Sequence, residues 1–308
     1  MRNLLILFCI SFLITACDDG DIITVSLDFD QELERCENDT QSYLFFDTRV
    51  DPSESLSLII PRNDANELLF SEPTPIDQPV TMDINGNTVR FNYRTYNRDI
   101  IGDELCNIIP SSDLIINEDF ESPAGTVEIT STIFDDDNDG VPTAFEGADP
   151  NGDGDFSDSL DTDGDGLFDY IDSDDDNDNV PTINEIDNSD GDDDPNTNPM
   201  DTDGNGTPDY LDDDDDGDMV LTRFEDENTN DNPRDDTANN AEGVLVPHYL
   251  NDQETGEFTN VNTITTTYTR IVFTNFIVRD VDIEILRTDI INLGTLESTI
   301  TLPEEDDN

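Results

Sequence analysis

A twelve-residue pattern rich in aspartate recurs through the middle of this 308-residue chain. In its fullest form, acidic residues stand at positions 1, 3 and 5, glycine at position 6 and a carboxylate at position 12. Two clean copies, loops 1 and 2, span residues 135–146 and 161–172. Loops 3, 4 and 5 span residues 174–185, 201–212 and 214–225 and depart slightly from the pattern. So much negative charge at alternate positions indicates a cation at the centre of each loop.

Calcium is the cation that suits this spacing. It takes six to eight oxygens at about 2.3–2.6 Å, from alternate side chains, from the main-chain carbonyl at position 7 and from a closing carboxylate. A glycine at position 6 permits the sharp turn. The pattern therefore predicts at least five calcium sites with these ligands: Asp135, Asp137, Asp139, Val141 and Glu146; Asp161, Asp163, Asp165, Leu167, Asp169 and Asp172; Asp174, Asp176, Asp178, Val180 and Glu185; Asp201, Asp203, Asn205, Thr207, Asp209 and Asp212; Asp214, Asp216, Asp218, Val220 and Glu225.

Position 9 divides the loops into two alternating types. It is aspartate in loops 2 and 4, the Asp-type loops, and threonine in loops 1, 3 and 5, the Thr-type loops. The alternation exposes a longer repeat, because residues 141–146 return at 180–185 and again at 220–225. Residues 247–251 read as a worn further copy of residues 208–212. Between the paired loops lie acidic stretches that are candidates for further ions, at 149–160, 187–200 and 226–236.

The flanks of the loops exclude a helix–loop–helix protein. Glycine, proline and asparagine follow loops 1 and 3, so neither loop leads into an amphipathic helix. The tandem loops, above all Asp-Thr-Asp-Gly-Asp-Gly-Leu-Phe-Asp-Tyr-Ile-Asp at 161–172, resemble the thrombospondin type 3 repeat family over about residues 135–252. The resemblance implies a chain wrapped around a row of calcium ions with little secondary structure. Asn179 and Met219 replace the position-6 glycine, which weakens the case for those two sites.

Composition supports a metal. Of the formal net charge of −65, most comes from the stretch between Asp135 and Asp236, which holds 39 acidic residues and two arginines. Such a segment without counterions should be disordered. A solvated acidic linker is the alternative, but a linker does not need glycine at position 6 with a carboxylate six places later.

The N-terminus predicts export and lipidation. Residues 1–16 read as a signal peptide whose apolar run is too short to span a bilayer comfortably. The sequence Ile14-Thr15-Ala16-Cys17 resembles the bacterial lipobox, with Cys17 as the acylated residue and Ile14 where leucine is usual. Residues 17–21 form an acidic tether, which resembles signals that send lipoproteins to the outer face of an outer membrane; a plain flexible tether is the alternative. An ordinary secretory signal is the alternative for the whole segment.

Cysteine usage agrees with export. Once Cys9 is removed and Cys17 is lipidated, Cys36 and Cys106 remain as a pair in an oxidising compartment. A disulfide between them would close a long loop and stabilise the fold by roughly 4 kcal/mol. Two buried free thiols are the alternative.

The regions around the repeats predict β-structure. Alternating apolar residues mark strands near 23–29, 89–93 and 126–134, and Asn85-Gly86 between two such runs predicts a hairpin. Strand composition returns at 261–279, 281–286 and 299–302, before an acidic tail at 304–308. We expect a mainly β fold, in which residues 22–134 and 257–303 build one β-sandwich and the calcium-cored, largely irregular repeat array is an insertion. Two separate β-domains are the alternative.

Neither catalysis nor nucleic-acid binding is expected. The mature chain holds one histidine, His248, read as a surface substitution, and no nucleophile, phosphate-loop or zinc motif. The net charge repels phosphate but favours cationic partners, or anionic glycans through bridging calcium. One hypothesis is a structural or adhesive, calcium-binding lipoprotein of the bacterial outer membrane. The other is a β-sandwich that binds a carbohydrate or protein, with the array as spacer. Phe91, Tyr93 and Tyr96 are candidate contacts if exposed, although Phe91 and Tyr93 share one strand face, which predicts that these two are buried.

Overall fold

The computed structural model describes residues 27, 29–36, 40–75, 78–109, 111–152, 156–187, 189–191, 194–195, 197–264, 267–283, 285–286 and 289–303. Strands in antiparallel sheets dominate the regular structure of these residues, which confirms a mainly β fold. The predictions for the signal peptide at 1–16, lipidated Cys17, the tether at 17–21 and the tail at 304–308 lie outside the described residues.

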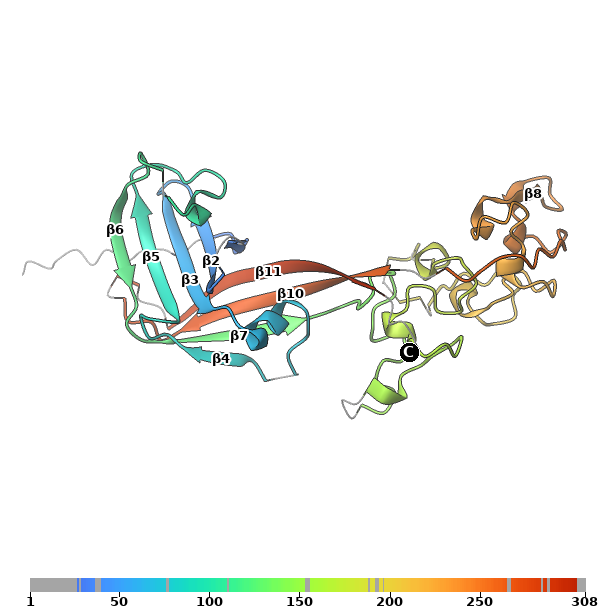
Figure 1. The fold of residues 1–308 in the computed structure, drawn as a ribbon, viewed down its shortest axis with the longest axis horizontal. Helices are drawn as coiled ribbons and strands as arrows, with labels where there is room; N and C mark the ends of the chain where they lie inside the picture. The colour runs from blue at the N-terminus through green and yellow to red at the C-terminus, as the bar shows by residue number, and fades with distance from the viewer. Residues whose placement is uncertain are drawn as a thin grey trace, which may run out of the picture. The chain divides into compact units, whose positions relative to one another are not determined.

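A five-stranded sheet forms the first layer (Figure 1). Its strands pair in the order β1-β2-β3-β5-β6, each antiparallel to its neighbour. Large apolar side chains on β2, β3 and β5 are buried, so this sheet supplies much of the core. The strands are β1 (Glu34–Cys36), β2 (Ser42–Arg49), β3 (Glu54–Pro61), β5 (Arg90–Tyr96) and β6 (Ile116–Glu121).

A four-stranded sheet joins strands from both sides of the repeats. Its order is β11-β10-β7-β4, with β4 (Val80–Asp83) and β7 (Thr126–Thr132) before the repeats and β10 (Thr267–Arg279) and β11 (Ile290–Pro303) after them. Burial alternates along β10, as expected for a strand with one covered face. The rings of Phe45 on β2 and Phe276 on β10 lie 4.6 Å apart, so the two sheets pack face to face.

The predicted hairpin at Asn85-Gly86 is wrong. β4 pairs with β7 in one sheet, whereas β5 belongs to the other, so this turn carries the chain between sheets. The Asn85 side chain explains how, because its Oδ1 accepts hydrogen bonds from the N–H groups of residues 87–89, at 2.9 to 3.3 Å. Ile84 and Val89, on either side of the turn, are both buried. The turn therefore satisfies its own polar groups and does not need hydrogen bonds between β4 and β5.

Four other strand predictions need correction. No strand covers the described residues of 281–286, because Ile283 and Leu286 are buried within a turn instead. β10 begins at Thr267, later than the predicted 261, and residues 299–302 are part of the longer β11. Leu27 and Phe29 are not in a strand, and residues 22–26 lie outside the described part of the chain.

The disulfide between Cys36 and Cys106 is confirmed, with Cα atoms 5.2 Å apart. The chain divides into two compact units. The sandwich unit comprises Met1–Asn63, Val80–Ile129 and Asn275–Thr295, and the repeat unit comprises Asp64–Pro79, Thr130–Thr274 and Leu296–Asn308. The short elements are α2 (Asp64–Glu67), η1 (Leu68–Phe70), η2 (Glu104–Cys106), η3 (Phe156–Asp158), η4 (Asp169–Ile171), η5 (Thr182–Asn184), η6 (Asp209–Leu211), η7 (Thr222–Phe224), η8 (Pro233–Asp235), β8 (Thr237–Asn239), β9 (Leu245–Pro247) and η9 (His248–Leu250).

Candidate metal centre

One backbone hydrogen bond closes each of the five loops. The position-9 N–H donates to the carbonyl of the residue just before position 1, at 2.9 to 3.1 Å, in every loop. In loops 2 to 5 this contact coincides with the start of a single 3-10 turn, η4, η5, η6 or η7. The loops thus share a backbone fold with almost no regular structure, as the spacing predicts. The closing donors are Thr143, Asp169, Thr182, Asp209 and Thr222.

The side chains at positions 3 and 5 brace the loop with one oxygen each. Oδ1 of position 3 accepts the position-5 N–H, and Oδ1 of position 5 accepts the position-7 N–H. In loop 1, for example, Asp139 Oδ1 accepts from Val141 at 2.8 Å. These bonds use one side-chain oxygen of each of these residues to hold the loop backbone.

In the Thr-type loops the second oxygen has no hydrogen-bond donor. Five of these six aspartates are buried, and Asp218 is partly exposed. A buried carboxylate oxygen without a donor costs free energy unless a cation occupies the space it faces. The donorless atoms are Oδ2 of Asp137, Asp139, Asp176, Asp178, Asp216 and Asp218.

The side chain at position 9 forms hydrogen bonds with the residue at position 2. Aspartate and threonine exchange these two positions between the Asp-type and the Thr-type loops. In loop 2, the Asp169 carboxylate accepts both the N–H and the hydroxyl of Thr162, each at 2.8 Å. In loop 3, the Thr182 hydroxyl accepts the N–H of Asp175 at 3.3 Å. Loop 4 repeats the first arrangement, with Asp209 accepting from Thr202. Asp169 and Asp209, predicted as ligands, therefore have a bracing role in this structure.

Carboxylates from different loops come together in two clusters. Asp139 and Glu146 of loop 1 meet Asp175 of loop 3, and Asp178 and Glu185 of loop 3 meet Asp215 of loop 5. Within each cluster one oxygen per residue lies within 4.8 Å of the others, and all six residues are buried. Both side-chain oxygens of Asp175, Asp215, Glu146 and Glu185 have no hydrogen-bond donor. These clusters can hold metal ions between repeats.

Sequence reasoning missed Asp175 and Asp215, because the loop pattern assigns no ligand to position 2. A signal was present: aspartate stands at position 2 wherever threonine stands at position 9, and threonine wherever aspartate does. Such an exchange indicates direct contact between the two positions. It leaves the position-2 carboxylate of the Thr-type loops available to a neighbouring repeat.

The predicted ligands within single loops also gather. Three groups have their oxygens within 4.8 Å of one another: Asp135, Asp137 and Asp139; Asp161, Asp163 and Asp165; Asp174, Asp176 and Asp178.

Loop 4 departs from this pattern. The Asn205 amide nitrogen donates to Asp203 at 3.0 Å and to Asp212 at 2.7 Å, in the space where a cation would lie in the other loops. In both Asp-type loops the position-12 residue also accepts a backbone N–H, Asp172 from Asp174 and Asp212 from Asp214. It thereby links its loop to the next one.

Burial and neighbouring charges raise the pKa values of the cluster carboxylates. Burial, followed by the charges of Asp139 and Asp135, raises the pKa of Glu146 to about 10. Burial also raises the pKa of Asp175 well above its ordinary value, with Asp139 the largest neighbouring charge. Burial therefore favours the neutral form of both groups, whereas a bound divalent cation favours their charged forms.

The residues at positions 6 and 7 take the expected backbone. Gly140 and Gly206 have φ of +101° and +97°, and Asn179 and Met219 adopt +75° and +81° in the corresponding places. The substitutions therefore leave the turn intact. At position 7, the side chains of Val141 and Val180 are fully buried, those of Leu167 and Val220 are partly exposed and that of Thr207 is exposed.

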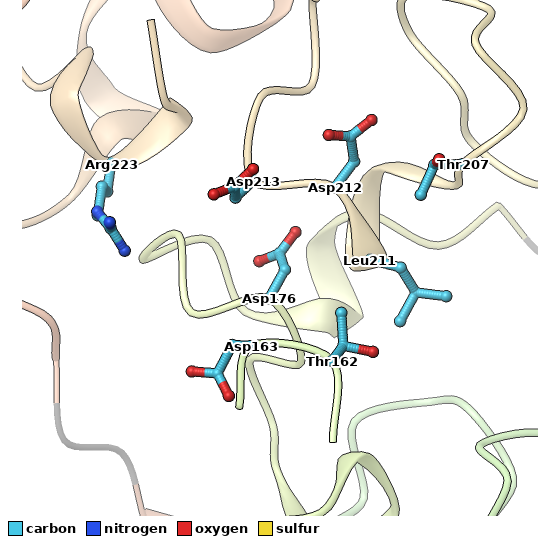
Figure 2. A pocket seen from close by; sticks show the side chains of 8 residues that line it. All are labelled: Thr162, Asp163, Asp176, Thr207, Leu211, Asp212, Asp213 and Arg223. Atoms are coloured by element: carbon cyan, nitrogen blue, oxygen red, sulfur yellow. The ribbon is translucent and has the colours of Figure 1, made fainter. Parts of the chain in front are cut away.

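A cavity of about 400 Å³ opens between loops 2 to 5. Figure 2 shows the carboxylates of Asp163, Asp176 and Asp213 and the guanidinium of Arg223 around it. Arg223 also donates to the carbonyl of Asn177 at 3.5 Å. A positive side chain among these acids reduces repulsion between neighbouring loops. The remaining lining residues are Thr162, Thr207, Leu211 and Asp212.

His248 is buried, with 5% of its surface exposed, so its interpretation as a surface substitution is wrong. It occupies the place that Asp169 and Asp209 hold in the other copies, and both of those are also buried. Residue 241, seven positions earlier, is alanine and offers no hydroxyl. The repeat that contains His248 therefore keeps this residue buried but lacks the hydrogen bond from a position-2 hydroxyl.

No protein-family model, curated protein or solved structure matches this chain. Among the residues that the structure describes, no helix has the length and apolar character needed to cross a membrane.

Proposed function

We propose that the repeat unit binds calcium and that calcium holds its loops together. The observation that carries this proposal is the set of buried carboxylate oxygens without donors in and between the Thr-type loops. All the available side-chain ligands are oxygens, which favours a hard cation over zinc or copper. Magnesium fits less well, because it keeps several waters and demands octahedral geometry, whereas these sites offer many flexible carboxylates.

Calcium here would act as a structural link. Asp139 and Glu146 would share an ion with Asp175, which lies in the next Thr-type loop, so each ion would join segments that are a whole repeat apart in the sequence. Such links replace the hydrophobic core that this stretch lacks, because few of its residues are large and apolar. The free energy of ion binding would then contribute directly to the folding of the repeat unit.

A calcium titration of the mature chain, residues 17–308, tests the proposal. We expect circular dichroism and protease resistance of the repeat unit to increase on adding calcium and to reverse with chelator. Glu185→Gln should weaken at least one site tenfold or more, whereas Glu242→Gln, an exposed acid outside the clusters, should titrate as wild type. An unchanged spectrum between chelator and millimolar calcium would overturn the proposal.

We further propose a structural or adhesive role on the bacterial outer membrane, with lipid on Cys17 and a repeat array of the thrombospondin type 3 kind. The N-terminal sequence and the tandem loops support this. Phe91, Tyr93 and Tyr96 are buried, so they offer no platform for a carbohydrate and nothing specific favours a ligand-binding sandwich. Radiolabelled fatty acid incorporation into wild type but not Cys17→Ser tests the anchor. Cell adhesion that survives chelation would contradict an adhesive role of the calcium-bound repeat unit.

A further inference from the structure

The position-2 acids of the Thr-type loops form a series along the chain. Asp136, Asp175 and Asp215 hold the same place in loops 1, 3 and 5. Asp175 closes the cluster of loop 1, and Asp215 closes the cluster of loop 3. Loop 5 has the same acids to offer, Asp218 and Glu225, and requires a closing carboxylate from a later copy.

Glu254 stands where that carboxylate is expected. The worn copy at 247–251 aligns with 208–212, and the same alignment, continued past its end, places Glu254 on Asp215. The worn copy also keeps its place in the structure. Tyr249 is 4% exposed, and its pKa is raised first by burial and then by Glu185 and Asp215, the acids of the preceding cluster. Tyr210 stands in the same relation to the cluster before that.

The backbone brings Glu254 to loop 5. The N–H of Phe258 donates to the carbonyl of Phe224 at 2.7 Å, which seats this segment against the residue preceding Glu225. The Glu254 N–H donates to the Asn251 carbonyl at 2.8 Å and folds the chain back by one turn. Burial raises the pKa of Glu225 to about 9, and the charge of Glu254 is among the contributing neighbours.

Two acids of loop 5, Asp218 and Glu225, have unused oxygens. Glu225 is 1% exposed and its Oε1 has no donor, and Oδ2 of Asp218 has none either. Oδ1 of Asp218 is already used by the N–H of Val220, at 2.8 Å. This is the arrangement of the two earlier clusters, in which a position-5 aspartate and a position-12 glutamate await a third carboxylate.

Asp136, the first member of the series, is paired with a positively charged side chain. Asp136 has no earlier loop to close, and Arg270 of β10 lies against it with Nη2 3.1 Å from Oδ1. The guanidinium also donates from Nε to the Asp136 carbonyl at 3.2 Å, and Arg270 is itself 8% exposed. At this end of the series the protein supplies the positive charge from its own sequence. Within the described part of the chain, no arginine or lysine forms an ion pair with Asp175, Asp215 or Glu254.

We propose that Glu254 joins Asp218 and Glu225 in a third inter-loop site for a divalent cation of the calcium class, an inference that rests on calcium binding by the repeat unit. Glu254 is partly exposed, whereas Asp175 and Asp215 are buried. The third site is therefore the most open of the three and the weakest.

Calcium titration of the mature chain by calorimetry, on four variants, tests the third site. Glu254→Gln should remove one site from the weakest class or weaken it at least tenfold. Glu254→Asp should retain the site, because Asp serves at 175 and 215. Glu257→Gln, an exposed acid in the same segment, is the matched control and should match wild type. Glu185→Gln reports separately on the second cluster.

The outcomes separate the two proposals. If Glu254→Gln titrates as wild type while Glu185→Gln loses a site, the third site is overturned and calcium binding by the repeat unit stands. If wild type binds no calcium, both fall. Should Glu254→Gln lower the folded fraction by circular dichroism, Glu254→Asp decides: loss of the site in a folded Glu254→Asp would contradict the inference, and retention would support it.

Discussion

Position 6 of the loops requires a left-handed backbone, and Met219 adopts it without glycine, at a φ of +81°. For a residue with a side chain this conformation costs about 1–2 kcal/mol, part of which is returned because glycine is more flexible in the unfolded chain. Met219 is 92% exposed, so its side chain contributes little packing. We expect Met219→Gly to raise the unfolding temperature of the calcium-loaded chain by about 1–3 °C, measured by calorimetry.

Asn179 provides the contrast at the same position of loop 3. Its amide nitrogen donates to the Asn262 carbonyl at 2.9 Å, and its oxygen accepts the N–H of Ile264 at 3.0 Å. Asn179→Gly relieves the same backbone but loses both bonds, so it should lower the unfolding temperature. If both glycine variants shifted the unfolding temperature in the same direction, the two hydrogen bonds of Asn179 would not be what distinguishes the two sites.

Asp47, in the sandwich unit, makes stability depend on pH. Burial, followed by the charge of Asp30, raises its pKa to about 7, against an ordinary value of about 3.9 in the unfolded chain. The fold thus favours the neutral form, and this contribution is complete below about pH 4 and lost as the pH rises through 7. Asp47→Asn keeps an acceptor for the Gln31 N–H and should be more stable than wild type by about 1 kcal/mol at pH 8, but not at pH 4. Urea midpoints at the two pH values check this, and an equal gap at both would contradict it.

At the scale of a loop, the contact between positions 2 and 9 holds the turn. In loop 4 the Thr202 hydroxyl donates to Asp209 at 2.7 Å, and the Asp209 carboxylate is buried. Thr202→Val removes that donor at nearly constant volume and should destabilise the loop by about 1–2 kcal/mol, whereas Thr202→Ser should not. Hydrogen exchange across residues 201–212 measures the difference. Equal exchange in both variants would show that the hydroxyl does not brace the loop.

The same scale explains what the sequence could predict. Loop geometry followed from spacing, because each bracing bond joins residues two to nine positions apart. The role of Asp175 could not be predicted from spacing, because its partners Asp139 and Glu146 lie a whole repeat away in the sequence and only the structure brings them together. The Asn85 turn failed for a related reason: its local signal is real, but the partner of β4 is β7, set by burial of apolar faces far along the chain.

At the scale of the whole molecule, the two units differ in what their interiors contain. The sandwich unit has a core of large apolar side chains and one disulfide, whereas the repeat unit has buried acids in clusters that can hold metal ions, and we propose that calcium links its loops. Reducing agents and chelators should therefore act on different parts of the chain.

The double variant Cys36→Ala/Cys106→Ala should destabilise the sandwich unit by about 4 kcal/mol, because the disulfide closes a loop with a sequence separation of 70. Its calcium titration should match wild type, since the residues of the clusters described above all belong to the repeat unit. Chelation of wild type should instead admit protease within 135–252 and leave the five-stranded sheet of the disulfide-linked sandwich unit resistant. Limited proteolysis with mass spectrometry under both conditions reads the two effects. The same cleavage pattern from both treatments would mean that the two units unfold as one, because a cross-link in either would then support the whole chain.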